Sequence, residues 1–349
     1  MGTSTFKYQK ALPSLNLKGE IKQTSEDFVV EEIISFEPTG EGEHLFLWIQ
    51  KRNQNTDWVA KQIARWAGVN NRLVNFGGLK DRYAVTRQWF SVHLPGKADP
   101  DFDLFDIEGT QVLKSTRHNK ALKSSALRGN RFNITISQLS IEDRTTLNEQ
   151  DIQNIEERIQ WIKIHGAPNY FGEQRFGIDG GNLEAAKRLF ANESRDNPMT
   201  QRMAVSAARS HIFNLVLEKR IQNQSWNQYL AGDVCMLNGS KSFFDPNEQD
   251  KATLPARMNE LDIHPTGIMM GKGALHIHDE VEKIEQEVIE QQSVFAQGLI
   301  SKKLPMERRA LRVRLHEFSF QVLPDQIHLS FMLPAGSFAT AVVREIIDD

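Results

Sequence analysis

Apolar and polar residues alternate in several short stretches of the chain, which is the pattern of β-strands that bury one face. These stretches lie at 28–31, 44–51, 86–94, 132–136, 311–315 and 327–332. In the second of them, Leu45, Leu47 and Ile49 fall on one side of the strand. The pattern therefore predicts a sheet with one face turned towards a core.

Apolar residues recur at helical spacing elsewhere in the chain. These regions lie between Asn55 and Gly68 and at 150–165, 182–190 and 202–222. A closing helix is expected from Phe338, with Ser337 as its N-cap. The order of strand, helix, strand, turn and strand in the first part of the chain indicates an α+β fold with a mixed, largely antiparallel sheet.

The stretch 75–92 joins two of the expected strands through a glycine pair and a charged triplet. Gly77 and Gly78 are expected to adopt a backbone conformation that residues with a Cβ resist. They present three charged side chains at the end of the turn, Lys80, Asp81 and Arg82. Adjacent positive charge favours an ionised carboxylate, which suits a nucleophile or a base. The alternative is a surface ion pair within the triplet, since such pairs are common and weak.

Composition restricts the class of protein. The 349 residues suffice for about two domains, and 40% hydrophobic with 25% charged residues is ordinary for a globular protein. No apolar run approaches the roughly 18 residues of a membrane helix, and the N-terminal residues lack a signal-peptide core. We therefore expect a cytoplasmic protein. The single cysteine, Cys235, excludes an internal disulfide and a cysteine-rich zinc site.

A local basic strip stands out from the overall net charge of -3. Between residues 114 and 131 the chain has no acidic residue and carries Lys114, Arg117, Lys120, Lys123, Arg128 and Arg131. Such a strip can follow a phosphate backbone, because the local field matters more than the total charge. A solvated face is the equally simple alternative.

Motifs for cofactors and metals fail on spacing or on residue type. The stretch 267–273 resembles a phosphate loop, but it is one residue short and Gly273 replaces the Ser or Thr that would hold magnesium. His276 and His278 share a strand face without a third ligand cluster. The sequence therefore predicts neither a cofactor nor a metal.

The segment GGLKDRYAVTRQ resembles the central motif of the TruD family of tRNA pseudouridine synthases. All fixed positions of that motif are filled, by Gly78, Lys80, Asp81, Ala84, Thr86 and Gln88. Four further stretches resemble the family in the same order, at 25–33, 127–136, 168–177 and 333–345. The resemblance therefore covers nearly the whole chain.

The resemblance implies a fold, a domain division and an activity. It implies a pseudouridine-synthase catalytic domain formed by 1–165 and 309–349, and an inserted α+β TRUD domain at 166–308. The implied reaction isomerises uridine of tRNA, usually uridine 13 in the dihydrouridine arm, to pseudouridine without a cofactor. The implied protein is a monomer with no obligate protein partner and no membrane attachment.

The resemblance also assigns site residues. Asp81 is the implied nucleophile, attacking either C1′ of the ribose or C6 of the base. The implied substrate-binding residues are Lys22, Phe28, Lys80, Arg82, Gln88, Asn130, Phe132, Phe331 and Ser337. RNA contacts are expected from the basic strip and from Arg175. For Phe28, Phe132 and the aromatic residues around Arg175, packing in a core is the alternative.

Two other functions compete with the isomerase. The first is a tRNA-binding chaperone without turnover. The second is a glycosidase that pairs Asp81 with Glu31 or Glu32, because carboxylate pairs cleave glycosidic bonds. The enzyme hypothesis predicts that Asp81 lies open beside Lys80, Asn130 and Phe132, whereas a closed, buried ion pair at Asp81 would contradict it.

Overall fold

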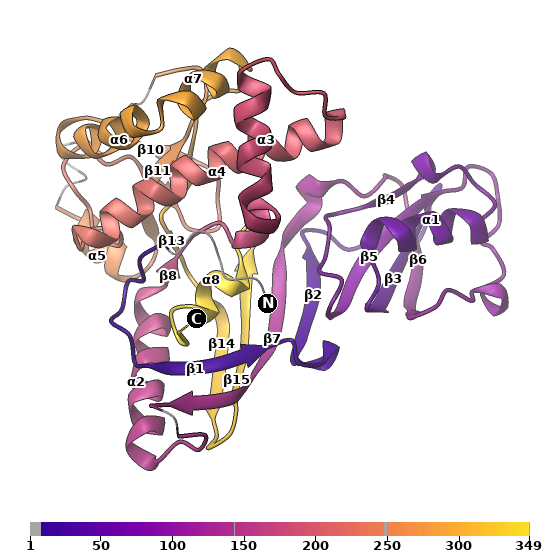
Figure 1. Ribbon diagram of the computed structural model, residues 1–349. Helices are drawn as coiled ribbons and strands as arrows, with labels where there is room; N and C mark the ends of the chain where they lie inside the picture. The colour runs from indigo at the N-terminus through magenta and orange to yellow at the C-terminus, as the bar shows by residue number, and fades with distance from the viewer. Residues whose placement is uncertain (1–7, 143, 248–249, 251, 275, 349) are drawn as a thin grey trace. The chain divides into compact units, whose positions relative to one another are not determined.

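The computed structural model describes residues 8–142, 144–247, 250, 252–274 and 276–348, which divide into two compact units (Figure 1). The sheet unit contains residues 16–156 and 316–336. The helix-rich unit contains residues 8–15, 157–315 and 337–348 of the described chain. Both units are therefore assembled from segments that are far apart in the sequence.

This division by contacts differs from the domain boundaries expected from the sequence. Both chain ends, residues 8–15 and 337–348, belong to the helix-rich unit, although the predicted catalytic domain includes them. The helix α2, Glu149–His165, crosses the division. The boundaries of the inserted domain at 166 and 308 stay a prediction.

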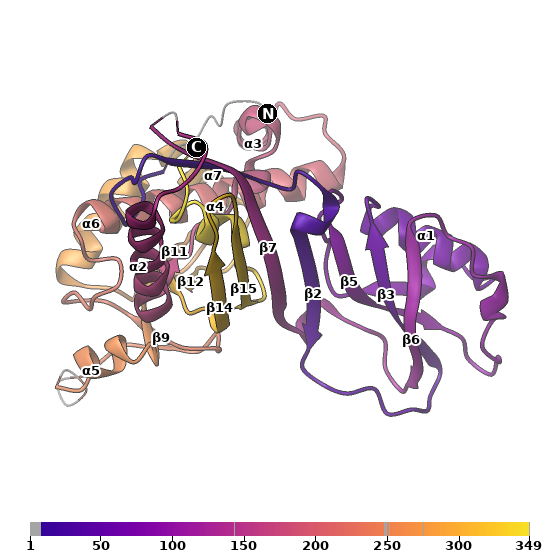
Figure 2. The same cartoon turned by 90° about the horizontal axis from the view of Figure 1, so that it is seen from below.

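One sheet of nine strands, counted over the described residues, forms the sheet unit. Its strands are β1 Leu17–Ile21, β2 Phe28–Ile34, β3 His44–Arg52, β4 Val74–Phe76, β5 Val85–His93, β6 Thr110–His118, β7 Leu127–Ile141, β14 His316–Val322 and β15 Ile327–Pro334. The main order is β14-β15-β7-β2-β5-β3-β6, with β1 added on β7 and β4 on β5 (Figure 2). Strands β2 and β5 are parallel and the other pairs are antiparallel. The predicted α+β class with a mixed, largely antiparallel sheet is confirmed.

Helix α1, Thr56–Trp66, packs its apolar side on one face of β3 and β5. Its Val59 and Ile63 are fully buried, as are Leu47 and Phe90 of the strands. These are positions that the alternating and helical patterns assigned to the core. The helix begins next to Asn55, as expected, and Gly68 follows it with a φ of 61°.

The helix-rich unit contains the remaining elements. Its helices, besides the C-terminal part of α2, are α3 Gly181–Phe190, α4 Pro198–Gln222, α5 Leu254–Asn259, α6 Asp279–Gln291, α7 Ser293–Ser301 and α8 Ala339–Val343. Strands β9 Cys235–Leu237, β10 Phe243–Phe244, β11 Ile263–Met269 and β12 Glu307–Ala310 form a small sheet, and β8 Ala167–Pro168 pairs with β13 Arg312–Val313. Helix α4 carries much of the core of this unit, with Ile212 and Phe213 fully buried.

Two expectations near the C-terminal end were wrong in detail. The expected strand at 311–315 is reduced to β13, because Arg312 does not point to solvent but is 3% exposed and donates to the carbonyl of Met258 at 2.8 Å. Ser337 is not an N-cap, since α8 is preceded by Phe338 and the Ser337 hydroxyl donates to Asn169 Oδ1 at 3.1 Å.

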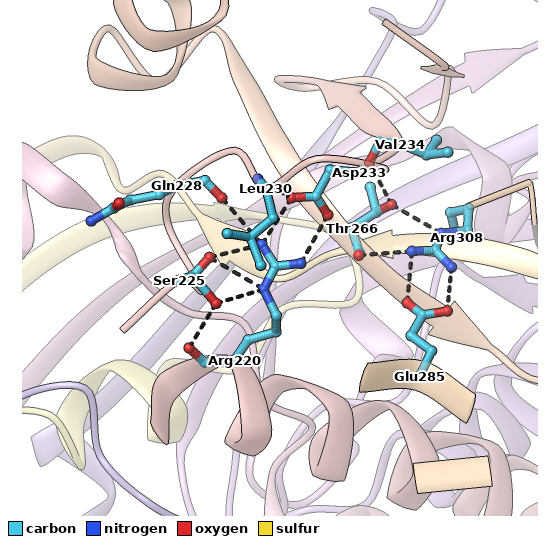
Figure 3. Close-up of polar contacts among 9 residues, drawn as sticks. All are labelled: Arg220, Ser225, Gln228, Leu230, Asp233, Val234, Thr266, Glu285 and Arg308. Carbon is cyan, nitrogen blue, oxygen red and sulfur yellow. Dashed lines mark hydrogen bonds and ion pairs between the residues drawn. The ribbon is translucent and has the colours of Figure 1, made fainter. Parts of the chain in front are cut away.

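Two buried ion pairs stabilise the helix-rich unit (Figure 3). Arg220 binds both carboxylate oxygens of Asp233 at 2.8 and 2.9 Å, and its remaining N–H groups donate to Ser225 and Gln228. Arg308 binds both oxygens of Glu285 at 2.7 and 2.8 Å, and it also donates to Thr266. Both pairs thus satisfy their hydrogen-bonding groups internally, as buried charges must.

None of the helices in the described part of the chain combines the length and the apolar character that a membrane crossing would require.

Candidate active site

One face of the sheet unit changes from apolar to polar where the charged loop lies. Across five neighbouring strands, residues in direct register share this face: Phe331 of β15, Phe132 of β7, Val30 of β2, Thr86 of β5 and Lys51 of β3. Two positions along the strands, Asn130 lies opposite Glu32. Since side chains on a strand alternate between faces, the sheet gathers these aromatic and polar groups on one surface.

The loop 77–84, between β4 and β5, is held by buried polar side chains beneath it. Lys51 Nζ is fully buried and donates to the carbonyl oxygens of Asp81 and Gln54, both at 2.8 Å. Gln88 Nε2 donates to the Gly78 carbonyl at 3.2 Å. The Thr56 hydroxyl accepts from the Lys80 backbone N–H at 3.0 Å. The loop backbone is therefore fixed before any ligand arrives, which is the preorganisation that a catalytic group requires.

The Asp81 side chain is partly open to solvent. Its Oδ2 lies 3.1 Å from Lys22 Nζ, and the side chains of Asp81 and Lys22 are 30% and 18% exposed. Lys22 has a φ of 63°, a conformation that costs a residue with a Cβ free energy, and its ammonium group lies 4.1 Å from the centre of the Phe28 ring. Asp81 is thus neither a closed buried pair nor a partner of Arg82.

Lys80 and Glu32 form a second ion pair, which is buried. Lys80 Nζ lies 3.0 Å from Glu32 Oε2, and their side chains are 6% and 0% exposed. Glu32 Oε1 also accepts from the Trp89 backbone N–H at 3.3 Å. Lys80 is therefore paired with Glu32, contrary to the expectation that it flanks the Asp81 carboxylate.

Space, rather than backbone conformation, explains the glycine at position 77. Neither Gly77 nor Gly78 has a positive φ, so the expected conformational reason was wrong. A Cβ on Gly77 would lie 3.1 Å from Glu32 Oε2, whereas a Cβ on Gly78 would meet Leu127 at an ordinary 3.9 Å. Gly77 leaves room for the Glu32 carboxylate below the loop.

Three phenylalanines form the aromatic part of the surface. The Phe132 ring lies 6.1 Å from Phe28 and 5.7 Å from Phe331, measured between ring centres. All three side chains are buried, with Phe132 at 7% exposure the least covered. The predicted residues Phe28, Phe132 and Phe331 are therefore brought together, and Lys22 links them to Asp81.

Besides Glu32 Oε2, which is ion-paired with Lys80, two buried oxygen atoms on this face have no hydrogen-bond partner in the described part of the chain: Thr86 Oγ1 and Asn130 Oδ1. A buried polar atom without a partner costs about 1–3 kcal/mol, so such atoms are rare unless a ligand uses them. Thr86 stands directly between Val30 and Lys51, and Asn130 stands two positions from Phe132. The site therefore offers acceptors beside the aromatic rings.

Burial changes the titration of the lysine under the loop. The pKa of Lys51 is lowered from 10.5 to about 8, chiefly because burial desolvates its ammonium group; the charge of Asp81 raises the pKa and that of Lys80 lowers it. A lysine that titrates so near neutral pH is typical of a functional site.

The other expected substrate contacts differ in their surroundings. Gln88 is fully buried and is engaged with Thr56 and Gly78, so it lies below the loop. Arg82 is exposed, with its guanidinium 5.4 Å from the Tyr83 ring. Ser337 belongs to the helix-rich unit, where it donates to Asn169. Their roles in substrate binding stay predictions.

The basic strip is partly neutralised by ion pairs. Arg117 pairs with Asp99, and Arg131 pairs with Glu317 and Glu31. The remaining cations of the strip are exposed: Lys114, Lys120, Lys123 and Arg128. We find no carboxylate paired with these four among the described residues. The hypothesis that the strip contacts RNA therefore rests on them.

The glycosidase alternative lacks a suitable second carboxylate. Glu31 alternates to the opposite face of β2 and pairs with Arg87 and Arg131. Glu32 is fully buried in its pair with Lys80. A general acid or base must reach the substrate, and neither glutamate is placed to do so.

Two charged residues occupy strand positions that the alternating pattern assigns to the core. Lys51 is in phase with Leu45, Leu47 and Ile49, which are core positions, and Glu32 is in phase with Phe28. A charged residue at a core position of a strand must find a partner or a function. The buried roles of Lys51 and Glu32 could have been identified in this way.

Comparisons with known proteins show the family of the chain. The family model described as tRNA pseudouridine synthase D (TruD) matches residues 11–196 and 196–346. The chain belongs to the TruD family of tRNA pseudouridine synthases. The family is one of isomerases. Its members named tRNA pseudouridine synthase D include proteins of Hydrogenovibrio crunogenus, 42% identical over 94% of this chain and 92% of that protein, and of Methylococcus capsulatus, 43% identical over 97% and 94%.

A solved TruD structure shares the fold. The crystal structure of a protein described as a putative tRNA pseudouridine synthase D from Methanosarcina mazei superposes with a TM-score of 0.72 and covers 98% of this chain and 96% of its own. At 21% identity it supports the architecture alone. No group of three or more His, Cys, Asp or Glu side chains with the arrangement of metal ligands occurs among the described residues of this TruD member.

Proposed function

We propose that this chain isomerises uridine to pseudouridine in tRNA, with Asp81 as the nucleophile. The observation that carries the proposal is a partly exposed carboxylate on a loop whose backbone is fixed by the buried Lys51. Membership of the TruD family supports the reaction class. The finer assignment, uridine 13 in the dihydrouridine arm, follows from the family resemblance.

The proposed reaction is balanced without a redox partner. The bond from C1′ to N1 breaks, the uracil turns, and C5 forms the new bond to C1′. The proton on C5 leaves, and N1 gains a proton. Asp81 attacks either C1′ or C6 as a carboxylate nucleophile, which divides one difficult exchange into two easier steps.

The target base must leave the RNA stack to reach Asp81. We propose that the uracil packs against Phe132, the least buried of the three clustered rings, because stacking holds an unpaired base. Asn130 Oδ1 and Thr86 Oγ1, which lack partners in the described protein, accept hydrogen bonds from the bound nucleoside. Lys22 orients the Asp81 carboxylate through their ion pair.

The Asp81 loop also carries two exposed large side chains. Leu79 is 71% exposed and Tyr83 is 66% exposed, on either side of the charged triplet. Because the loop backbone is fixed, these side chains are held in solvent rather than folded away. They are therefore available to pack against RNA around the target, together with Arg82 and the exposed lysines of the basic strip. Monomeric state and cytoplasmic location remain part of the proposal.

The test is pseudouridine mapping at single-nucleotide resolution in unmodified tRNA. The intact protein should modify one uridine in the dihydrouridine arm, and Asp81→Asn and Asp81→Ala should lose turnover by at least about 10⁴-fold while binding the RNA. Asp57→Asn, at an exposed carboxylate of α1, is the matched control and should stay active. If the intact protein binds tRNA and modifies nothing, the chaperone function replaces this proposal.

A further inference from the structure

The main chain of the Asp81 loop is held by side chains rather than by secondary structure. Between residues 78 and 81 it makes no hydrogen bond to another main-chain group in the described part of the chain. The outer side of the loop is open, since Leu79 is 71% exposed and the Asp81 side chain is 30% exposed. The main-chain position of Asp81 therefore depends on the polar side chains that bond the loop from below.

Thr56 and Gln88 form one chain of hydrogen bonds beneath the loop. The Lys80 backbone N–H donates to the Thr56 hydroxyl at 3.0 Å, and that hydroxyl donates to Gln88 Oε1 at 3.1 Å. Gln88 Nε2 then donates to the Gly78 carbonyl at 3.2 Å. The chain starts and ends on the loop, and its two linking side chains come from α1 and β5.

The direction of every proton in this chain of hydrogen bonds is determined. A backbone N–H can only donate and a carbonyl can only accept, so the Lys80 and Gly78 ends cannot be reversed. The Thr56 hydroxyl must therefore accept on one side and donate on the other, which fixes the Gln88 amide with Nε2 towards Gly78. Thr56 and Gln88 are 1% and 0% exposed, so the loss of either side chain leaves buried polar groups without a partner.

The hydrogen bonds act on the residues next to the carboxylate. Lys51 binds the Asp81 carbonyl at 2.8 Å, and Thr56 binds the N–H of the residue before Asp81 at 3.0 Å. The main chain is thus fixed on both sides of the Asp81 Cα. A nucleophile must lie close to its productive position, because a displacement of about 1 Å can lower the rate about 100-fold.

We propose that Thr56 and Gln88 are positioning residues for the reaction at Asp81, and that Gln88 acts through the loop rather than on the substrate. The inference rests on the proposed function for the reaction itself. Both side chains are buried below the loop, so they should affect the chemical step and leave the affinity for tRNA nearly unchanged. This differs from the substrate-binding role that the family resemblance implies for Gln88.

The first test replaces the Thr56 hydroxyl with a methyl group. Thr56→Val should lower the single-turnover rate about 100-fold and change the dissociation constant of tRNA less than about twofold, whereas Thr56→Ser keeps the hydroxyl and should stay within about threefold of the intact protein. Thr135→Val is the matched control, because Thr135 is hydrogen-bonded to His328 at 3.2 Å and lies on the face of β7 opposite to Phe132. Equal rates of Thr56→Val and Thr135→Val would overturn the role of Thr56.

The second test changes the donor at position 88. Gln88→Met lacks a donor at every pH and should be at least about tenfold slower than the intact protein. The carboxyl group of Gln88→Glu can donate to the Gly78 carbonyl only while it is protonated, and burial favours that neutral form. Gln88→Glu should therefore turn over faster than Gln88→Met, by most at the acid end of a range from about pH 5.5 to 8. Equal rates of these two variants throughout the range would overturn the role of the donor.

Gln50→Glu is the matched control for the charge. Gln50 lies on β3, on the face opposite to Lys51, and accepts from Arg87 Nε at 2.9 Å. Its variant should keep the pH profile of the intact protein. If Thr56→Val or Gln88→Met does not fold, Gln88→Asn keeps the amide but is one methylene too short to reach both partners. Gln88→Asn should then lose rate while its circular dichroism stays native, and an intact rate would overturn the proposal.

Hydrogen exchange separates this inference from the proposed function. In Thr56→Val the amide protons of residues 77–84 should exchange at least about tenfold faster than in the intact protein, because the loop loses a support. Unchanged exchange would overturn the positioning role and leave the Asp81 chemistry standing. If the intact protein binds tRNA and modifies nothing, the proposed function fails, whereas faster exchange in the variant would still show that Thr56 holds the loop.

Discussion

Charged groups in two regions, the buried arginines Arg220 and Arg308 and the loop that carries Asp81, differ in how completely the protein satisfies them. In the helix-rich unit, Arg220 and Arg308 each hold a bidentate carboxylate and further acceptors (Figure 3). In the sheet unit, Asp81 has one contact with Lys22 and is open to solvent, and two neighbouring oxygens have no partner in the described chain. Closed networks contribute to a unique fold, whereas open ones keep groups available for a ligand.

The sharpest test of this comparison breaks a closed pair. Arg220→Ala leaves the Asp233 carboxylate buried without its partner, so it should lower the free energy of unfolding by about 3–5 kcal/mol. Arg257→Ala is the control, because its pair with Asp262 is partly exposed, at 32% and 50% of the two side chains, and should contribute less than about 1 kcal/mol. Urea unfolding measures both. A loss at Arg220 no larger than at Arg257 would contradict the structural role.

Removal of a buried acceptor without a partner should affect turnover more than stability. Asn130→Ala removes an oxygen acceptor that has no hydrogen-bond partner in the described protein. The free energy of unfolding should therefore change by less than about 1 kcal/mol. The turnover of uridine should fall about 100-fold, in the range of one lost hydrogen bond in the transition state. Asn133→Ala, on the same strand but the other face, should leave turnover unchanged. Single-turnover kinetics on tRNA would decide, and equal rates for the two variants would contradict the role of Asn130.

Lys51 sharpens the comparison through pH. Its folded-state pKa is about 8, whereas the unfolded chain titrates near 10.5, so between these values the unfolded state binds the extra proton. The free energy of unfolding contributed by this group therefore rises as pH increases from about 8 to 10.5, by about 3 kcal/mol. The stability of the unchanged protein relative to Lys51→Met should rise by that amount. If urea unfolding gives the same pH dependence of the free energy of unfolding for both proteins, Lys51 is not desolvated in this way.

The smallest effect is expected at the glycine pair. Gly77→Ala places a Cβ about 3.1 Å from the Glu32 carboxylate and should disturb the Lys80 pair, which lowers turnover about tenfold. Gly78→Ala meets only Leu127 at 3.9 Å and should change turnover less than twofold. Equal rates for these two proteins would show that the loop tolerates the contact.

The alternation of apolar and polar residues predicted most of the sheet unit, because a strand with one buried face has an apolar residue at every second position. It placed Phe28, Leu47 and Phe90 in the core, where the structure has them. It did not predict β1, which is short and gains its stability from a partner far along the chain. Residues 223–305 gave no clear strand pattern, since β9 and β10 are only three and two residues long.

The members and the arrangement of the candidate site stand differently. The family resemblance proposed Asp81, Lys22, Phe132 and Asn130 as site residues, which stays a prediction, and the charged triplet suggested that Lys80 and Arg82 surround the carboxylate. The structure differs, because Glu32 of the neighbouring strand lies below the loop and forms an ion pair with Lys80. Register between strands about 50 residues apart is a property of the whole sheet, and no local pattern specifies it.

Strand β15 has a consequence for the order in which the chain can fold during synthesis. It comes from residues 327–334, yet it pairs with β7 along eight consecutive positions, from Ile327 with Ile136 to Pro334 with Gly129. Until the ribosome has released these late residues, one edge of a 15-residue strand stays without its neighbour, and unpaired edges recruit other chains. A nascent chain of this protein therefore depends on its last segment to close the sheet, and shortened fragments ending before residue 327 should be prone to aggregation.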